Sequence, residues 1–191
     1  MHIPESACAN VIKSIDDIMK SDFNDYVKVK AIWGSILGYQ SVVLGHMAMG
    51  RIGNKVFAGP FRGMELIEDI YTTLFTPNLL GTYEWEIHDD LEKAIAKPYK
   101  HVINIGCAYG YYAVGLAMRM PNATIHAYDT DEKCRTQCKK MAELNGVADR
   151  IIIGEEFMGE NFAKFADEET LVFMDIEGAE REVFINSSGR V

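Results

Sequence analysis

Short apolar runs alternate with helically spaced segments along the second half of the chain. Strands are predicted at 102–105, 123–128, 151–153 and 171–174. The run at 102–105 is mostly β-branched, as expected of a strand covered on both faces. Helices are predicted between these runs at 111–120, 131–144 and 160–165, and a further helix begins at 179–185. This alternation predicts an α/β fold with a mostly parallel, Rossmann-like sheet and right-handed crossovers.

The first part of the chain has a different pattern. Helical spacing predicts helices at 6–20 and 22–49. The first helix has an apolar stripe at Ile12, Ile15, Ile18 and Met19. On the second helix, burial is expected at Val27, Ala31, Ile32, Ile36, Val42 and Val43.

Two further elements are predicted before the first strand. Gly59-Pro60 predicts the bend of a β-hairpin over 51–67, and a helix is expected at 83–96. We therefore divide the chain into an N-terminal helical cap with a hairpin, residues 1–80, and a Rossmann-like domain, residues 81–191.

Composition narrows the class of protein. A chain of 191 residues with 48% hydrophobic residues can bury one good core, which predicts a soluble globular protein. The net charge of -9 argues against nucleic acid as a partner, because phosphate binding needs a basic face. Four cysteines lack the paired spacing of a zinc site, so no metal site is predicted and the thiols are expected to be packed and reduced.

The chain is expected in the cytoplasm. Its first ten residues lack the basic and apolar regions of a signal peptide. The apolar segment 36–49 is shorter than the roughly 20 residues that span a bilayer, which favours a buried helix and no membrane partner.

A glycine turn follows the first predicted strand. Gly106 and Gly110 lie where the strand turns into a helix, and Asp129 ends the next strand. Glycines let the backbone approach a ligand, the helix N-terminus offers unpaired N–H groups, and a strand-end carboxylate can accept both ribose hydroxyls. This arrangement predicts a nucleoside cofactor. The alternatives are a turn that binds nothing and a helix N-cap role for Asp129.

The spacing of the glycines selects among nucleosides. A dinucleotide site needs G-x-G-x-x-G, but Ala108 and Tyr111 occupy the later positions. The remaining pattern, Asn104-x-Gly106-x-Ala108-x-Gly110, is similar to the D/E-x-G-x-G-x-G loop of methyltransferases that use S-adenosylmethionine (SAM). SAM carries no phosphate, so its loop has less need of an anion site.

A second motif sharpens this prediction. The fourth predicted strand runs directly into D-I-E-G-A-E at 175–180. Together with the G-x-x-x-G-Y-Y turn, this segment resembles the FkbM-type class I methyltransferases over about 81–184. The resemblance implies methylation of a small-molecule or sugar hydroxyl. The family usually has Asp at Asn104, Ala at Cys107 and Asn at Ala108, so the chain departs from it at these positions.

Candidate site residues follow from the two motifs. Asp175 and Glu177 project from the end of the fourth strand and are the catalytic candidates, as a base or as metal ligands. The alternative is a structural role, in which Glu177 and Glu180 hold the turn by accepting N–H bonds. Cofactor contacts are expected from Asn104, Gly106, Cys107, Ala108, Gly110, Tyr111, Asp129, Thr130 and Glu155. Tyr83 and Glu156 are weaker candidates, and Tyr111 fits core packing equally well.

The end of the chain leaves two functions open beside methyl transfer. A class I methyltransferase usually has three more strands after the fourth, so the fold is expected to be truncated. The fourth strand would then lie at an edge of the sheet although it is apolar. It is therefore expected to be covered, most simply by a second copy in a homodimer. A truncated fold favours a catalytically silent binding module. An NAD-dependent oxidoreductase is the weaker alternative, because the phosphate-binding glycines are missing.

Overall fold

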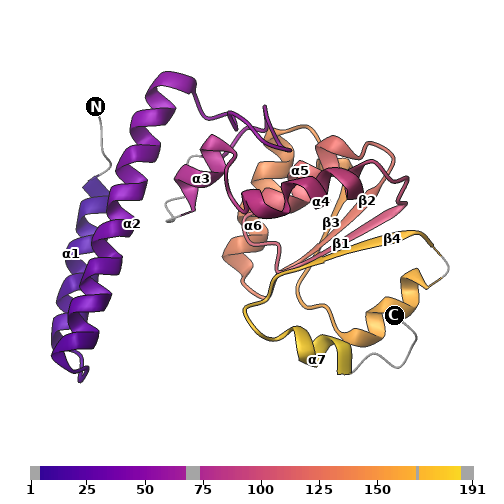
Figure 1. Cartoon of the computed structure of the whole chain (residues 1–191). Coiled ribbons are helices and arrows are strands. Elements are labelled where there is room, and N and C mark those ends of the chain that lie inside the picture. The colour runs from indigo at the N-terminus through magenta and orange to yellow at the C-terminus, as the bar shows by residue number, and fades with distance from the viewer. Residues whose placement is uncertain (1–4, 68–73, 167, 186–191) are drawn as a thin grey trace.

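A four-stranded parallel sheet is the centre of the molecule. The computed structural model describes residues 5–67, 74–166 and 168–185. The strands are β1 (His101–Ile105), β2 (Thr124–Tyr128), β3 (Ile151–Gly154) and β4 (Thr170–Met174). Their order is β3-β2-β1-β4, with every pair parallel (Figure 1). The predicted α/β, Rossmann-like fold is confirmed.

Helices cover both faces of the sheet. One face carries α4 (His88–Ile95), α5 (Tyr111–Arg119) and α6 (Glu132–Leu144), and the other carries the 3-10 helix η3 (Gly159–Phe165) and α7 (Glu180–Ile185) (Figure 1). Side chains along β1 point alternately to the two faces of the sheet. Val102 belongs to the core under α5 and α6, whereas Ile103 and Ile105 pack with Phe165 and Val183 on the other face. A short 3-10 helix, η2 (Ala148–Arg150), leads into β3.

The predicted β-hairpin over 51–67 is shorter in the structure. Helix α2 (Asp25–Ile52) continues further than expected and ends at Gly53, whose N–H donates to the carbonyl of Met49. Beyond it the chain pairs with itself in antiparallel fashion through the bridge between Lys55 and Glu65, and the N–H groups of Val56 and Leu66 donate to the carbonyls of Met64 and Asn54, both at 2.8 Å. The bend between these arms buries Phe61 against α5.

Two predicted helices also differ from the structure. The segment 83–96 is not one helix, because Glu84 takes a left-handed conformation with φ of 48°. A 3-10 turn, η1 (Trp85–Ile87), therefore precedes α4. Helix α3 (Phe75–Leu80) was not predicted, and it connects α2 to the sheet layers (Figure 1).

The N-terminal helices form a hairpin that stands off from the sheet (Figure 1). Helix α1 (Glu5–Lys20) packs along α2, but the expected buried stripe on α1 is wrong in part, because Ile12 is 69% and Met19 57% exposed. On α2, Val42 is buried as expected, whereas Ile36 is 44% exposed. Among the described residues, no helix combines the length and apolar character needed to cross a bilayer.

The main hydrophobic core extends across the predicted boundary at residue 81. Val56, Met64 and Leu79 belong to the same buried cluster as Val102 and Leu116. The division at 81 stays a prediction, and this packing favours a boundary at the end of α2 instead. The β4 strand lies at one edge of the described sheet, where Val172 is 36% exposed, and its cover by a second copy also stays a prediction.

The loop after α2 should be essential for folding. Phe61 is 3% exposed and its ring fills the space beside Gly115, so Phe61→Ala should cost about 3–5 kcal/mol in the free energy of unfolding. The matched control is Phe57→Ala, because Phe57 lies in the same loop and is 59% exposed. Urea unfolding followed by circular dichroism measures both. Equal losses in the two variants would show that the loop is not part of the core.

Candidate functional site

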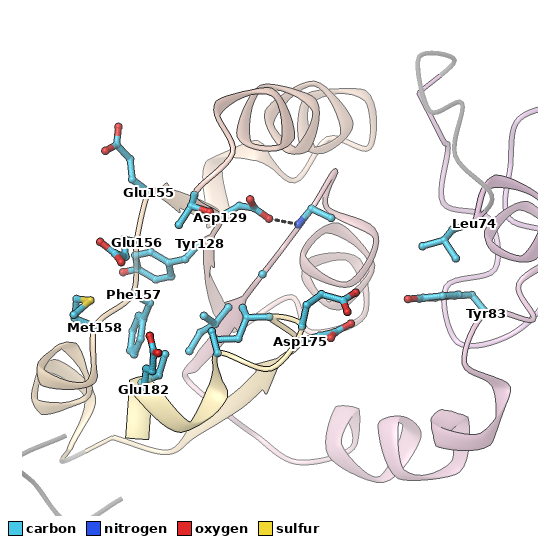
Figure 2. Close-up of a pocket in the computed structure, with 18 residues that line it drawn as sticks. Leu74, Tyr83, Tyr128, Asp129, Glu155, Glu156, Phe157, Met158, Asp175 and Glu182 are labelled. Atoms are coloured by element: carbon cyan, nitrogen blue, oxygen red, sulfur yellow. Dashed lines mark hydrogen bonds between the residues drawn. The ribbon is translucent and has the colours of Figure 1, made fainter. Parts of the chain in front are cut away.

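A cavity of about 520 Å³ opens at the carboxyl edge of the sheet. Its floor is formed where β1, β2 and β4 end, and one wall is the loop after β3 together with α7. Leu74 and Tyr83 face it from the opposite side (Figure 2). In open α/β sheets this edge is where ligands bind.

The glycine turn is shaped by close packing at the ends of β1 and β4. Gly106 has φ of 79°, and a Cβ at this position would clash with the backbone carbonyl of Asp175. Only glycine accommodates both the dihedral angle and the contact. The turn therefore brings the backbone of residues 106–108 to the cavity without a side chain at its first position.

Asp129 ties the turn to the end of β2. Its Oδ2 accepts a hydrogen bond from the Ala108 N–H at 2.8 Å, and its Oδ1 accepts one from the Asp131 N–H at 2.9 Å (Figure 2). The N-cap of α6 is Asp131, which accepts from the Lys133 N–H, so the alternative interpretation of Asp129 as that cap is wrong. Asp129 lines the cavity while holding the loop in place.

Most of the predicted site residues meet at this cavity. Those that line it are Gly106, Ala108, Asp129, Thr130, Glu155, Asp175 and Glu177. The other four, Asn104, Cys107, Gly110 and Tyr111, do not line it.

These four residues are buried behind the turn and pack against the rest of the protein. Asn104 is 1% exposed within β1, donates to the Phe173 carbonyl at 3.4 Å, and its Oδ1 has no partner in the described part of the chain. Gly110 begins α5 and packs against Cys138. A hydrogen bond with Cys138 and burial raise the pKa of the Cys107 thiol far above its usual range. Tyr111 packs edge-on against Phe61, as its core interpretation predicted.

The turn after β4 presents two carboxylates to the cavity. Asp175 and Glu177 both line it, and Asp175 points toward Tyr83 (Figure 2). The turn is held by Glu180, whose Oε1 accepts from the N–H groups of Ile176 at 3.0 Å and Gly178 at 3.3 Å. Glu180 is one of the two residues expected to hold this turn. Because Glu180 accepts both N–H bonds, Glu177 is left to face the cavity.

Tyr83 is the most informative residue on the far wall. Burial raises the pKa of Tyr83 to about 12, and the negative charges of Glu84, Asp175 and Glu177 add to the shift. The phenol is therefore protonated at neutral pH and can act as a hydrogen-bond donor opposite Asp175. Tyr83 was a weak candidate in the sequence, because the segment before the first strand was expected to line the pocket.

The apolar wall was missed by sequence reasoning. Tyr128 and Phe157 pack edge-on with ring centroids 5.0 Å apart, and Met158 lies beside them on the cavity (Figure 2). Burial raises the pKa of Tyr128. Tyr128 could have been identified from the sequence, because it directly precedes Asp129. Phe157 could not, because it follows β3 in a loop without a motif.

The cavity is strongly negative. Its carboxylates are Asp129, Glu155, Glu156, Asp175, Glu177 and Glu182, and no Lys or Arg is among the described residues that line it. The nearest compensation is Arg135, whose guanidinium lies 3.5 Å from Glu155 and also donates to the Asp129 carbonyl. Such a site favours a cation and repels a pyrophosphate.

Comparisons with known proteins found partial similarity to methyltransferases. The chain is similar to a release factor glutamine methyltransferase from Flavobacterium psychrophilum, with 31% identity over 87 residues. The similarity covers 46% of this chain and only 30% of the relative, so the chain spans about a third of that protein's length. No protein-family model matches.

Two solved structures are also similar. One is assigned as a sarcosine dimethylglycine methyltransferase from Galdieria sulphuraria, with a TM-score of 0.37, 16% identity, and coverage of 63% of this chain and 43% of that one. The other is an O-methyltransferase family protein from Burkholderia thailandensis, with a TM-score of 0.34, 13% identity, and coverage of 66% and 40%. The fold assignment rests on the strand order itself.

The turn after β4 should be sensitive to acid. Its N–H groups lower the pKa of Glu180, so this carboxylate stabilises the fold above its unfolded pKa of about 4.3, and the contribution is lost as pH falls through the lower folded value. Glu180→Gln should therefore lower the thermal midpoint at neutral pH, and the difference from the wild type should disappear once the pH is below the folded pKa of Glu180. Glu143→Gln, at an exposed carboxylate on α6, is the control. A loss that is the same at both pH values would contradict this role.

Proposed function

We propose that the cavity binds SAM and that the chain is a SAM-dependent methyltransferase. The proposal is supported above all by one arrangement: the Gly106 turn and Asp129 face the same cavity at the carboxyl edge of a parallel sheet. The positive φ of Gly106 and its packing against the Asp175 carbonyl keep a side chain out of the turn, so that the backbone of the turn borders the cavity. The 31% identical relative adds support at the level of methyltransferases in general.

Charge favours SAM over a nicotinamide dinucleotide. SAM carries a positive sulfonium and NAD a negative pyrophosphate, while the cavity is lined by six carboxylates. An anion at the glycine turn would lie beside Asp129 and Asp175, whose charges would oppose it. The oxidoreductase alternative is therefore disfavoured by electrostatics as well as by the missing glycines.

Each wall of the cavity suits one part of the cofactor. Asp129 can accept the ribose hydroxyls, and Gly106 and Ala108 offer backbone to the methionine part. The rings of Tyr128 and Phe157 provide an apolar wall for the adenine, with Glu155 at its edge. When bound, SAM supplies a methyl group on a good leaving group, so the protein has to align the acceptor and exclude water.

The remaining wall suits the methyl acceptor. Asp175 can take the proton from an acceptor hydroxyl, with Glu177 beside it and Tyr83 on the opposite wall. A metal-ligand role of the same two carboxylates is the alternative to this proton-acceptor role.

We further propose that the acceptor is a hydroxyl of a small molecule or sugar and that the chain is of the FkbM type. The support is the D-I-E-G-A-E turn, whose Asp175 and Glu177 face the cavity while Glu180 holds the backbone. A catalytically silent SAM-binding module is the second candidate, since it needs the same cofactor wall but no base. Loss of transfer in an Asp175 variant distinguishes the two.

Cofactor binding should depend on Asp129. Asp129→Asn keeps one of the two oxygens that accept the loop N–H groups but removes the charge and one acceptor for the ribose, so the affinity for S-adenosylhomocysteine should fall by about 1–3 kcal/mol, roughly 5- to 150-fold. Asp131→Asn is the matched control, because Asn caps a helix as well as Asp. Calorimetric titration measures both variants. A larger response of the wild type to NAD than to the adenosyl ligand would overturn the proposal.

Catalysis should depend on Asp175 without affecting the cofactor. Asp175→Asn should keep the affinity for S-adenosylhomocysteine within about threefold, because the residue lies toward Tyr83, away from the Asp129 wall. Transfer of a labelled methyl group from SAM to a set of monosaccharides should fall by roughly 100-fold or more in this variant. Undiminished transfer would remove Asp175 as the base. The absence of transfer in the wild type as well would favour the silent binding module.

A further inference from the structure

Helix α2 has three differently used faces. One packs against α1, where Ser14 and Ser35 hydroxyls lie 3.0 Å apart and Cys8 Sγ lies 3.2 Å from the Tyr39 hydroxyl. A second meets α3, where Phe75 lies against Gly45. The third face contacts neither helix and points away from the hairpin.

This third face is apolar and exposed. Its large side chains are Tyr26, Val29, Trp33, Ile36, Leu37, Leu44 and Met47, which we call the α2 stripe. Tyr26 is 77%, Val29 66% and Trp33 64% exposed. The spacing, mostly of three, four or seven residues, keeps the stripe on one side of α2 from Tyr26 to Met47, a length of roughly 33 Å. A continuous exposed apolar surface of this length marks an interaction site.

The order of residues in the stripe fits a second copy of the same helix. Its large side chains lie at equal distances on both sides of the midpoint between Ile36 and Leu37. In an antiparallel pair, Tyr26 would therefore face Met47, and Val29 would face Leu44. Trp33 would face Gln40, whose exposed amide can accept from the indole N–H. A surface that is complementary to itself is what a two-fold contact requires.

Charge permits the same contact. The hairpin at 5–52 has five Asp or Glu and five Lys or Arg, so it is neutral, and the whole net charge of -9 belongs to the rest of the chain. Two hairpins can thus approach without mutual repulsion. In the antiparallel register, Arg51 at one end of the stripe would also reach Asp22 of the partner copy.

The area is sufficient for a stable dimer. The seven residues are between 40% and 77% exposed, so complete burial of the stripe would remove an area on the order of the 800 Å² that each partner gives to a standard interface. We propose that the α2 stripe is a dimer interface, in which the α2 helices of two copies pack antiparallel around a two-fold axis between Ile36 and Leu37, with each α1 on the outer side of the pair. This contact is separate from the β4 edge and does not depend on the function of the cavity.

The test compares the full chain with three single variants in sedimentation velocity at micromolar concentration. Leu37→Glu puts charges on both sides of the axis and should weaken dimerisation at least tenfold. Ile12→Glu, at an exposed apolar position on α1, and Val172→Lys, at the β4 edge, should leave the dimer intact. Trp33→Glu repeats the test should Leu37→Glu fail to fold, as judged by circular dichroism.

Charge reversal tests the antiparallel register. Arg51→Glu should weaken the dimer several-fold, and Asp22→Lys in the same chain should restore it. A monomeric wild type, or a dimer that Leu37→Glu leaves unchanged, would overturn the proposal. Loss of the dimer through Val172→Lys alone would place the contact at the β4 edge instead. Co-sedimentation of a monomeric wild type with phosphatidylcholine vesicles, abolished by Trp33→Glu, would assign the stripe to lipid.

Discussion

The candidate site depends on the close approach of three strand ends. The N–H groups of Gly106 and Cys107 both donate to the Tyr128 carbonyl, at 2.8 and 2.9 Å, and the Asp175 N–H donates to the Ile105 carbonyl at 3.0 Å. These bonds join β1 to β2 and β4 just beyond the regular ladder. Because Gly106 has no side chain, the ends can meet this closely, and the carboxylates that follow β2 and β4 are brought to one cavity.

The strands could be predicted because periodicity and burial agree in this part of the chain. Every predicted strand begins and ends within one residue of the observed one. A parallel strand covered on both faces needs a continuous apolar run, and few other structures produce that pattern at this length. The same logic explains why Asp129 and Asp175 lie at one cavity, since residues that directly follow parallel strands share one edge of the sheet; their roles in binding and catalysis stay predictions.

The errors arose where tertiary contacts decide the outcome. Turn residues predicted a hairpin over 51–67, but α2 continues to Ile52 and the antiparallel pairing beyond it is short, because the apolar side chains of this segment cover the core. Phe157 reaches the cavity from a loop without regular spacing, so only the folded chain identifies it. On α1 and α2, the spacing predicted apolar faces but could not say what covers them, and Ile12, Met19 and Ile36 are exposed.

The distribution of charge connects the hairpin and the cavity. The net negative charge of the chain lies entirely outside the α1–α2 hairpin. Six of the carboxylates that contribute to it line one cavity. Charges of one sign gathered at a cavity raise the free energy of the folded chain, which is a cost that a bound cation offsets. A neutral apolar stripe at the far end of a projecting hairpin would let two such acidic domains associate while their cavities stay apart. The same sequence thus separates an electrostatic surface for ligand binding from an apolar surface for self-association.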